Sequence, residues 1–220
     1  MEIRNSQFAI RNWGVYLVTD RHQTGGRDLL DVVGQALAAG VRAFQLREKD
    51  LPTRDLCHLA EKLLAKTRAA GAALLINDRV DVAMALSADG VHLTRRSLPP
   101  KESRQLLGQA RLIGVSCHSL ADVREAVDGR ADFVVLGPIF ETPSKAAYGP
   151  PLTTALLREA RATTGVPILA IGGIQETRVP EVMAAGADGI AVISAVMAAP
   201  DPGQASADLL AAIATARRGN

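Results

Sequence analysis

The stretch Phe133-Val134-Val135-Leu136-Gly137-Pro138 is a short run of bulky apolar residues that stops at a glycine and a proline. A run of this kind, bounded by turn residues, is typical of a strand that is buried on both faces. The loop that follows, 139–151, holds Thr142, Ser144 and Lys145 close together. Hydroxyl groups and a lysine ammonium group are common ligands of anions. We therefore expect a buried strand that leads into an anion-binding loop.

Seven further apolar runs resemble this one, and each run is followed by a segment with apolar residues at helical spacing. The apolar runs are 15–19, 41–46, 73–76, 90–93, 112–116, 167–171 and 189–193. The helical segments are 29–40, 53–71, 80–86, 99–107, 119–128, 152–162, 177–185 and 204–217. This alternation predicts a parallel sheet with right-handed crossovers, and eight such units in about this length predict a compact (β/α)8 TIM barrel. A doubly wound open sheet ranks lower, because no Gly-x-Gly-x-x-Gly motif follows the first run.

A weak internal repeat supports the number of units. The segments Ala39-Gly40-Val41, Ala88-Asp89-Gly90, Ala131-Asp132-Phe133 and Ala187-Asp188-Gly189 each place a small or acidic residue directly before an apolar run. We expect one barrel domain over residues 15–220. It is preceded by a disordered or loosely attached extension over residues 1–14, which contain no long apolar run and so do not resemble a signal peptide.

The composition of the chain is that of a globular protein. Of its 220 residues, 48% are hydrophobic and 22% are charged, and the net charge is +2. So small a net charge does not favour a nucleic-acid or membrane partner. The two cysteines, Cys57 and Cys117, have no metal-type spacing and are expected to be reduced thiols in a cytoplasm.

The active site of a (β/α)8 barrel lies at the C-terminal ends of its strands. The sequence positions at those ends carry cations, hydroxyl groups, glycines and carboxylates: Asp20, Gln45, Arg47, Lys49, Asn77, Asp78, 94–97, Ser116, His118, Gly137, Thr142, Ser144, Lys145, Gly172, Gly173 and Ser194. Such a set suits a phosphorylated ligand. The pair Asn77-Asp78 also offers hard oxygen ligands for Mg²⁺.

Several of these residues have an alternative interpretation. Arg47 and Lys49 flank Glu48 and could belong to a solvated loop. Asp78 could cap the helix that begins near residue 80. His92, within the fourth run, is expected to be a histidine of the core.

With these residues in view, the chain resembles the thiamine phosphate synthase family, which includes the thiazole tautomerases. The resemblance covers Val15 to about Ala199. The motifs that carry it are Tyr16-Leu17-Val18-Thr19-Asp20, Gln45-Leu46-Arg47-Glu48-Lys49, Ile76-Asn77-Asp78-Arg79, Gly90-Val91-His92-Leu93, Ile113-Gly114-Val115-Ser116, Gly137-Pro138 with Thr142-Pro143-Ser144-Lys145, Ile171-Gly172-Gly173-Ile174 and Val192-Ile193-Ser194.

The resemblance implies a transferase that joins hydroxymethylpyrimidine pyrophosphate to thiazole phosphate and releases pyrophosphate. It assigns the pyrimidine pyrophosphate to Gln45, Arg47, Lys49, Asn77, Ser116 and Lys145. It assigns the thiazole phosphate to Thr142, Ser144, Gly173, Ile193 and Ser194. Asp78 would bind Mg²⁺, the cations Arg47, Lys49 and Lys145 would stabilise the leaving group, and the protein would be a homodimer.

The chain departs from the family pattern after the fourth run. It reads His92-Leu93-Thr94-Arg95-Arg96-Ser97 where the synthases usually read His-Leu-Gly-Gln-x-Asp, so Ser97 stands at the position of a second Asp ligand of Mg²⁺. A thiazole tautomerase, with His118 as the proton shuttle, is therefore an alternative. A tautomerase has no evident use for the set that favours the synthase, namely Arg47, Lys49, Asn77, Asp78 and Lys145. A third interpretation is a non-catalytic barrel that binds a phosphorylated ligand.

Overall fold

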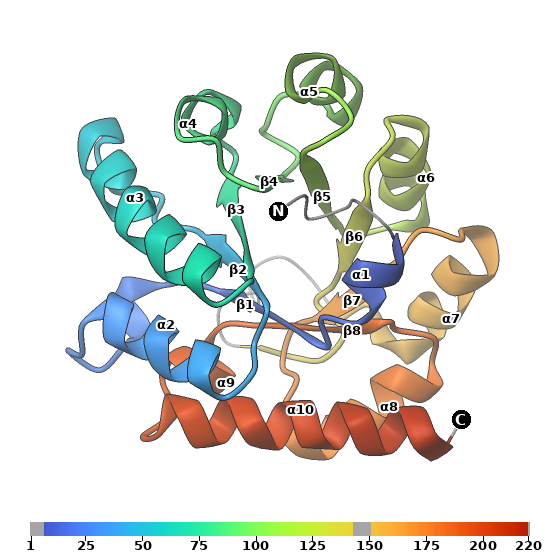
Figure 1. Cartoon of the computed structure of the whole chain (residues 1–220). Coiled ribbons are helices and arrows are strands. Elements are labelled where there is room, and N and C mark those ends of the chain that lie inside the picture. Colours follow the sequence, from blue (N-terminus) through green and yellow to red (C-terminus); the bar gives the residue numbers. More distant parts are fainter. Residues whose placement is uncertain (1–6, 143–150, 220) are drawn as a thin grey trace.

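The computed structural model describes residues 7–142 and 151–219, and the strands of these residues form one closed parallel barrel (Figure 1). The strands are β1 Val15–Val18, β2 Ala43–Leu46, β3 Ala73–Asn77, β4 Gly90–Leu93, β5 Leu112–Cys117, β6 Phe133–Leu136, β7 Ile168–Ile171 and β8 Gly189–Val192. The barrel closes where Val15 of β1 pairs in parallel register with Ile190 of β8. The predicted (β/α)8 barrel is confirmed.

Helices surround the strands (Figure 1). They are α2 Leu29–Ala38, α3 Thr53–Ala69, α4 Val80–Ala85, α5 Pro100–Leu107, α6 Leu120–Asp128, α7 Thr153–Thr163, α8 Val179–Ala184 and α10 Pro202–Gly219, with the short helices α1 Gln7–Arg11 and α9 Ser194–Met197 and the 3-10 turns η1 Arg21–Gln23 and η3 Glu176–Arg178. Side chains cap two of the helices as the sequence suggests: Asp28 accepts from the backbone N–H of Leu30 at 2.6 Å, and Ser119 accepts from that of Asp122 at 3.1 Å. Within the described residues, none of these helices is long and apolar enough to cross a membrane.

An aromatic cluster fills the barrel near the N-terminal ends of the strands. Trp13 stacks on Tyr16 with ring centroids 5.9 Å apart, and the edge of Phe133 meets Trp13 at 5.3 Å. Gly114 lies opposite, where a Cβ atom would be 2.3 Å from the Phe133 ring. The position therefore accepts only glycine as long as Phe133 keeps its place.

The N-terminal segment takes part in this packing. Ile10 and Trp13 are buried, and Arg11 forms an ion pair with Asp188. Residues 9–14 of the segment that we expected to be loosely attached therefore pack against the barrel. Residues 1–6 lie outside the described residues.

The repeated aspartates have a common structural role. The carboxylates of Asp89, Asp132 and Asp188 precede β4, β6 and β8, and each accepts a backbone N–H of the preceding strand, at 2.8, 2.7 and 2.8 Å respectively. Asp132 also accepts from the buried guanidinium group of Arg104 at 2.6 Å. At these three members the internal repeat thus reflects a hydrogen bond between neighbouring strands, whereas the member at Ala39-Gly40 has no carboxylate to form one.

Candidate active site

The closed parallel barrel brings the C-terminal ends of all its strands to one side, which we call the barrel mouth. Register pairs such as Val18 with Gln45 and Asn77 with His92 fix the order of side chains around it. The structure places at this end the following predicted residues: Gln45, Arg47, Lys49, Asn77, Asp78, Ser116, His118, Thr142, Gly173, Ile193 and Ser194. The predicted residues Ser144 and Lys145 lie outside the described residues.

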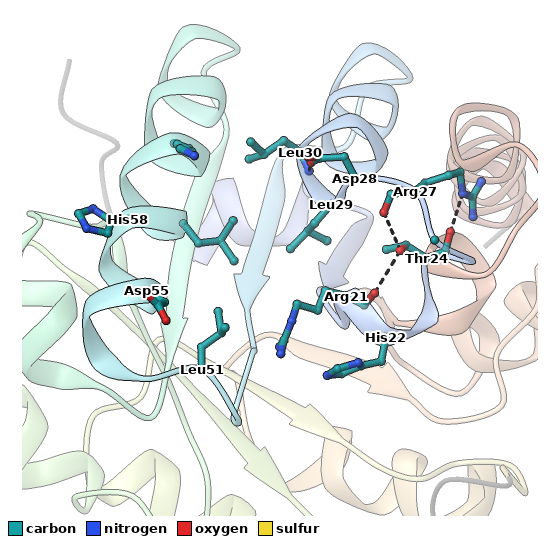
Figure 2. A pocket seen from close by; sticks show the side chains of 13 residues that line it. Arg21, His22, Thr24, Arg27, Asp28, Leu29, Leu30, Leu51, Asp55 and His58 are labelled. Atoms are coloured by element: carbon teal, nitrogen blue, oxygen red, sulfur yellow. Dashed lines mark hydrogen bonds between the residues drawn. The ribbon is translucent and has the colours of Figure 1, made fainter.

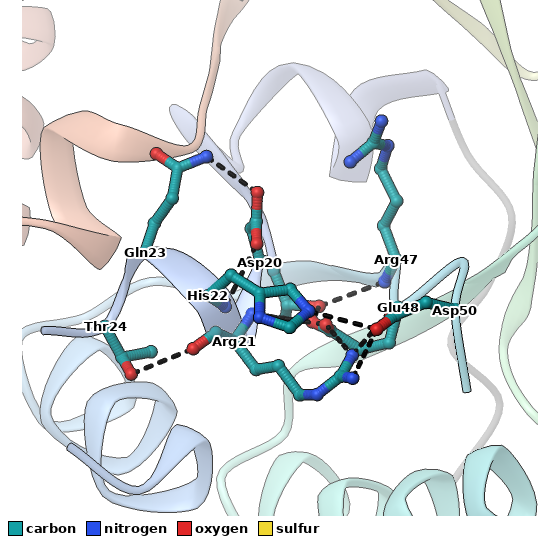
Figure 3. A network of polar contacts seen from close by, with 9 residues as sticks. Asp20, Arg21, His22, Gln23, Thr24, Arg47, Glu48 and Asp50 are labelled. Carbon is teal, nitrogen blue, oxygen red and sulfur yellow. Dashed lines mark hydrogen bonds and ion pairs between the residues drawn. The ribbon is translucent and has the colours of Figure 1, made fainter. Parts of the chain in front are cut away.

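A buried carboxylate ties the loops after β1 and β2 together (Figure 3). The Glu48 side chain is 2% exposed and accepts from Thr19 Oγ1 at 2.7 Å, from the backbone N of Arg21 at 3.1 Å and from Arg21 Nη1 at 3.1 Å. Thr19 Oγ1 in turn accepts from the backbone N of Arg47 at 3.0 Å. A buried charge is tolerated when it is paired and hydrogen-bonded. Glu48 therefore anchors the loop that carries Arg47, while Arg47 is partly exposed and Lys49 is exposed.

Among residues 7–142 and 151–219, the Arg47 guanidinium group takes no part in the Glu48 network. Figure 3 shows it pointing away from the Glu48 network, while Arg21 and His22 turn toward Asp50. Hydrogen bonds from Arg21 and then from His22 hold the pKa of Asp50 below its usual range. Arg47 itself contacts this network through its backbone, so the loop is fixed without occupying the Arg47 guanidinium group.

The end of β3 presents two oxygen donors. Asn77 Oδ1 is buried and has no hydrogen-bond partner among the described residues. A buried polar atom without a hydrogen bond lowers the stability of the fold by about 1–3 kcal/mol, and a ligand that bonds to it offsets this cost. Asp78 follows in a left-handed conformation with φ +66°, and its backbone N–H donates to the carbonyl of His92 at 2.9 Å. The N-cap of α4 is Arg79, without a side-chain cap hydrogen bond, so the structure does not bear out the capping alternative for the Asp78 carboxylate.

Within the barrel, a polar chain links β2, β1, β4 and β5 and reaches the mouth at Ser116. Gln45 Nε2 donates to Tyr16 Oη at 3.4 Å, Tyr16 Oη lies 3.4 Å from His92 Nδ1, and His92 Nε2 lies 2.9 Å from Ser116 Oγ. Burial, assisted by the charge of Arg47, lowers the pKa of His92 to about 3. Burial raises the pKa of Tyr16. Both side chains are therefore neutral near pH 7.

The loop after β4 carries Ser97 where the resemblance leads us to expect a carboxylate. Ser97 Oγ accepts from the backbone N of Thr94 at 2.8 Å and lies 3.1 Å from Thr94 Oγ1. Arg95 pairs with Asp122 of α6 at 2.8 Å. These side chains and Ser116 line a cavity of about 140 Å³ at the mouth. Across residues 7–142 and 151–219, no group of three or more His, Cys, Asp and Glu side chains could hold a metal ion.

His118 is oriented by two hydrogen bonds. Its Nδ1 lies 2.5 Å from the carbonyl oxygen of Gly137, and its backbone N–H donates to Asp122 Oδ2 at 2.7 Å. A carbonyl only accepts, so Nδ1 carries the hydrogen and Nε2 is left able to accept a proton. The neighbouring Cys117 is not a nucleophile, because burial and then the nearby Asp122 raise the pKa of its thiol to about 12.

The loops after β6 and β7 lie against one another. The backbone N–H of Phe140 donates to the carbonyl of Gly172 at 3.1 Å, and Arg178 donates to the carbonyl of Gly173 at 2.9 Å. At Gly173, φ is +64° and a Cβ atom would be 2.5 Å from the carbonyl oxygen of Glu141. This close approach requires glycine. It brings the segment that leads to Thr142 against the glycine pair.

Helix α9 begins at Ser194, directly after β8 and Ile193. The first N–H groups of a helix have no partner within the helix and suit an anion. The backbone here is thus chemically compatible with the predicted phosphate contact of Ile193 and Ser194.

A second cavity, of about 570 Å³, lies to the side of the mouth, between α2 and α3 (Figure 2). Leu29 and Leu30 line it from α2, and Asp55 and His58 line it from α3. The guanidinium group of Arg27 at its rim is occupied by backbone carbonyls, including those of Met197 and Pro200. The predicted site residues lie elsewhere, so we assign the site to the barrel mouth.

Sequence reasoning passed over three residues that organise the mouth, namely Thr19, Glu48 and Tyr16. The sequence predicted His92 to be a core residue, and its burial confirms this. The contact between His92 and Ser116 was not predicted. A usable signal existed only for Glu48, an acidic residue between two cations directly after a strand.

The comparisons with known proteins agree with this arrangement. Residues 15–196 match the family described as Thiamine monophosphate synthase. A Geobacter sulfurreducens protein, whose thiamine-phosphate synthase name is provisional, is 53% identical over 91% of this chain and 94% of its own length. The thiamine-phosphate synthase of Roseiflexus sp. is 46% identical over 92% of this chain and 86% of its own length. The solved thiamine phosphate pyrophosphorylase of Pyrococcus furiosus is 34% identical, covers 94% of this chain and 98% of its own, and superposes with a TM-score of 0.86.

Proposed function

The chain belongs to the thiamine monophosphate synthase family, and we propose on this basis that it is a thiamine-phosphate synthase. This transferase joins hydroxymethylpyrimidine pyrophosphate to thiazole phosphate in thiamine biosynthesis. The observation that carries the proposal is the arrangement of the barrel mouth. There the backbone of Arg47 is anchored by Thr19, and Asn77 Oδ1 has no hydrogen-bond partner among the described residues.

The reaction exchanges one bond for another at the pyrimidine methylene carbon. The C–O bond to the pyrophosphate breaks, and the pyrophosphate leaves with the electron pair. The lone pair of the thiazole nitrogen then forms the new C–N bond. In this proposal Arg47 and Lys49, with Lys145, stabilise the charge on the leaving group. Gln45, Asn77 and Ser116 orient the pyrimidine substrate.

The second substrate is held on the other side of the mouth. We assign its phosphate to Thr142, Ser144, Gly173, Ile193 and Ser194. Support comes from the close packing of the β6 and β7 loops at Gly173 and from the start of α9 at Ser194.

Mg²⁺ is part of the proposal. Asp78 and the unpartnered Asn77 Oδ1 are hard oxygen donors in adjacent positions. Mg²⁺ usually binds one or two carboxylates, substrate phosphates and several waters, so the residues present fit a metal that is held largely by the substrate. When bound, it would supply neutralising charge to the pyrophosphate. The hydroxyl group of Ser97 already bonds to Thr94 and is not assigned to the metal.

The proposal also covers cellular setting and assembly. We place the protein in the cytoplasm, with small phosphorylated molecules as its partners, and treat it as a homodimer, as the resemblance to the family implies. Light scattering coupled to gel filtration measures the mass of the assembly, and a single-chain mass would overturn the homodimer.

The geometry of His118 favours a second candidate. Its Nδ1 hydrogen is directed to Gly137, which leaves Nε2 as a base at the mouth. Such a base could move a proton on a thiazole phosphate carboxylate, which is the reaction of the thiazole tautomerases. Glutamine replaces His118 in the test, because it preserves polarity but cannot act as a base. An unchanged rate of thiazole aromatisation in His118→Gln would overturn this candidate.

The synthase proposal is tested with the purified protein, both substrates and Mg²⁺. Thiamine phosphate is detected by fluorescence after oxidation to thiochrome. We expect product from the wild type and a large loss, on the order of a hundredfold, in Arg47→Met, because removing one hydrogen-bond donor that stabilises charge in a transition state typically costs about 2.7–4 kcal/mol. Exposed Arg54 of α3 is the matched control, and Arg54→Met is expected to retain activity. Absence of product from the folded wild type would overturn the proposal.

A further inference from the structure

The polar chain within the barrel connects two residues that the proposed function assigns to the same substrate. It runs from Gln45 through Tyr16 and His92 to Ser116, with successive distances of 3.4, 3.4 and 2.9 Å. Gln45, Tyr16 and His92 are each at most 2% exposed, whereas Ser116 is partly exposed at the cavity of about 140 Å³. The chain therefore leads from the protein interior to the site.

The chemistry of these groups sets the direction of the hydrogen bonds. Gln45 Nε2 can only donate, so Tyr16 Oη accepts there and directs its own hydrogen to His92 Nδ1. A neutral imidazole whose Nδ1 accepts carries its hydrogen on Nε2. His92 Nε2–H therefore donates to Ser116 Oγ. The described residues offer the Ser116 hydroxyl hydrogen no acceptor of its own, so this hydrogen can be donated to a ligand.

The surroundings keep this direction fixed. The His92 imidazole is buried, and its Nδ1 is occupied by the hydrogen bond from Tyr16. Burial keeps the Tyr16 phenol protonated, so the phenol retains the hydrogen that it donates. The ring of Phe133 lies 5.4 Å from that of Tyr16 and 6.0 Å from that of His92, and it packs against both rings without taking part in the hydrogen bonds.

We propose that His92 is a positioning residue: as the Nε2–H tautomer, it makes Ser116 a hydrogen-bond donor toward the substrate. The site would thus select a ligand that presents an acceptor to Ser116, such as a ring nitrogen or a phosphate oxygen. The contact with substrate rests on the proposed function, whereas the tautomer and the direction of the chain do not.

The tautomer is measured first, on the free protein with ¹⁵N-labelled histidine, by long-range ¹H–¹⁵N NMR. The His92 signals are assigned by their loss in His92→Gln. We expect the Nε2–H pattern. An Nδ1–H pattern would overturn the proposal whether or not the protein is a synthase.

Kinetics then separate positioning from mere packing. Tyr16→Phe keeps the ring but removes the hydrogen bond to Nδ1, so we expect a mixture of His92 tautomers and a rise of about tenfold in KM for the pyrimidine substrate, the equivalent of one neutral hydrogen bond. Phe133→Leu, a packing control in the same cluster, is expected to lower the melting temperature and leave the tautomer intact. A Tyr16→Phe protein with an unchanged tautomer and an unchanged KM would overturn the proposal. If the wild type makes no thiamine phosphate, the proposed function fails, and the NMR measurement still decides the tautomer.

Discussion

Replacing Glu48 with alanine tests whether the buried network sets the position of Arg47. The change removes a carboxylate that accepts from Thr19 Oγ1, the backbone N of Arg21 and Arg21 Nη1. A hydrogen bond to a charged group contributes about 1.5–3 kcal/mol, and a buried donor left without a partner costs about 1–3 kcal/mol. Arg21 keeps its bonds to Asp50, so we expect a total loss of about 3 kcal/mol from the free energy of unfolding.

Two assays measure the effect of Glu48→Ala. For a domain of this size, a loss of 3 kcal/mol lowers the melting temperature by about 6–12 °C, which calorimetry resolves. We also expect kcat/KM to fall by about tenfold or more, equivalent to about 1.4 kcal/mol of transition-state stabilisation, because the hydroxyl of Thr19 is no longer held in place to accept from the backbone of Arg47. The values of kcat/KM for the wild type and the variant are measured at a temperature below the melting temperature of the variant.

The control is Asp50→Asn. Asp50 binds the same arginine, but its side chain is 55% exposed, so we expect a melting temperature and kcat/KM close to those of the wild type. If Glu48→Ala does not fold, Glu48→Gln keeps the shape and removes only the charge. If Glu48→Ala lowers the free energy of unfolding by about 3 kcal/mol and leaves kcat/KM unchanged, the reasoning is refuted, because the network would then stabilise the fold without positioning Arg47.

Three further predictions concern stability. Asp132→Ala leaves the buried guanidinium group of Arg104 unpaired and should cost about 3–5 kcal/mol in urea unfolding; a cost below about 1 kcal/mol would contradict the structure. Gly173→Ala places a Cβ atom against the carbonyl oxygen of Glu141 at a positive φ. We therefore expect the free energy of unfolding to fall by about 1–3 kcal/mol and the KM for the thiazole phosphate to rise; an unchanged KM would contradict this prediction. The pKa of His92 is about 3 in the folded state and about 6.5 in the unfolded state. Between these pH values the unfolded state binds more protons, so the free energy of unfolding falls as the pH is lowered, by at most about 1.4 kcal/mol per pH unit. His92→Gln should flatten that slope, and an identical slope would show that other groups cause it.

The barrel was predictable from the sequence because its signal is local. Each strand is an apolar run such as 133–136, and each long helix has its own amphipathic period and often its own cap, as at Asp28. The helices α1 and α9 were missed because each has only one turn or slightly more, which gives no period to detect. The position of Trp13 depends on a stack with Tyr16 and an edge contact with Phe133, and nothing near Trp13 in sequence indicates this.

The site was predictable in position but not in its internal bonding. Parallel strands in a closed barrel end on one side, so residues after strands, such as Arg47, could be placed at the mouth from sequence order alone. The partners of Glu48 lie 27 and 29 positions earlier in the chain, and those of His92 lie 24 positions later and 76 earlier. A single sequence carries no signal for such pairs, because they form only when the strands are in register.

The most direct test of the synthase assignment is the stoichiometry of the two products. Purified protein is incubated with hydroxymethylpyrimidine pyrophosphate, thiazole phosphate and Mg²⁺, and released pyrophosphate and thiamine phosphate are quantified in the same samples. We predict one pyrophosphate released for each thiamine phosphate formed, and neither product when the thiazole phosphate is left out. Pyrophosphate release without thiamine phosphate, or no release by the folded protein, would contradict the assignment.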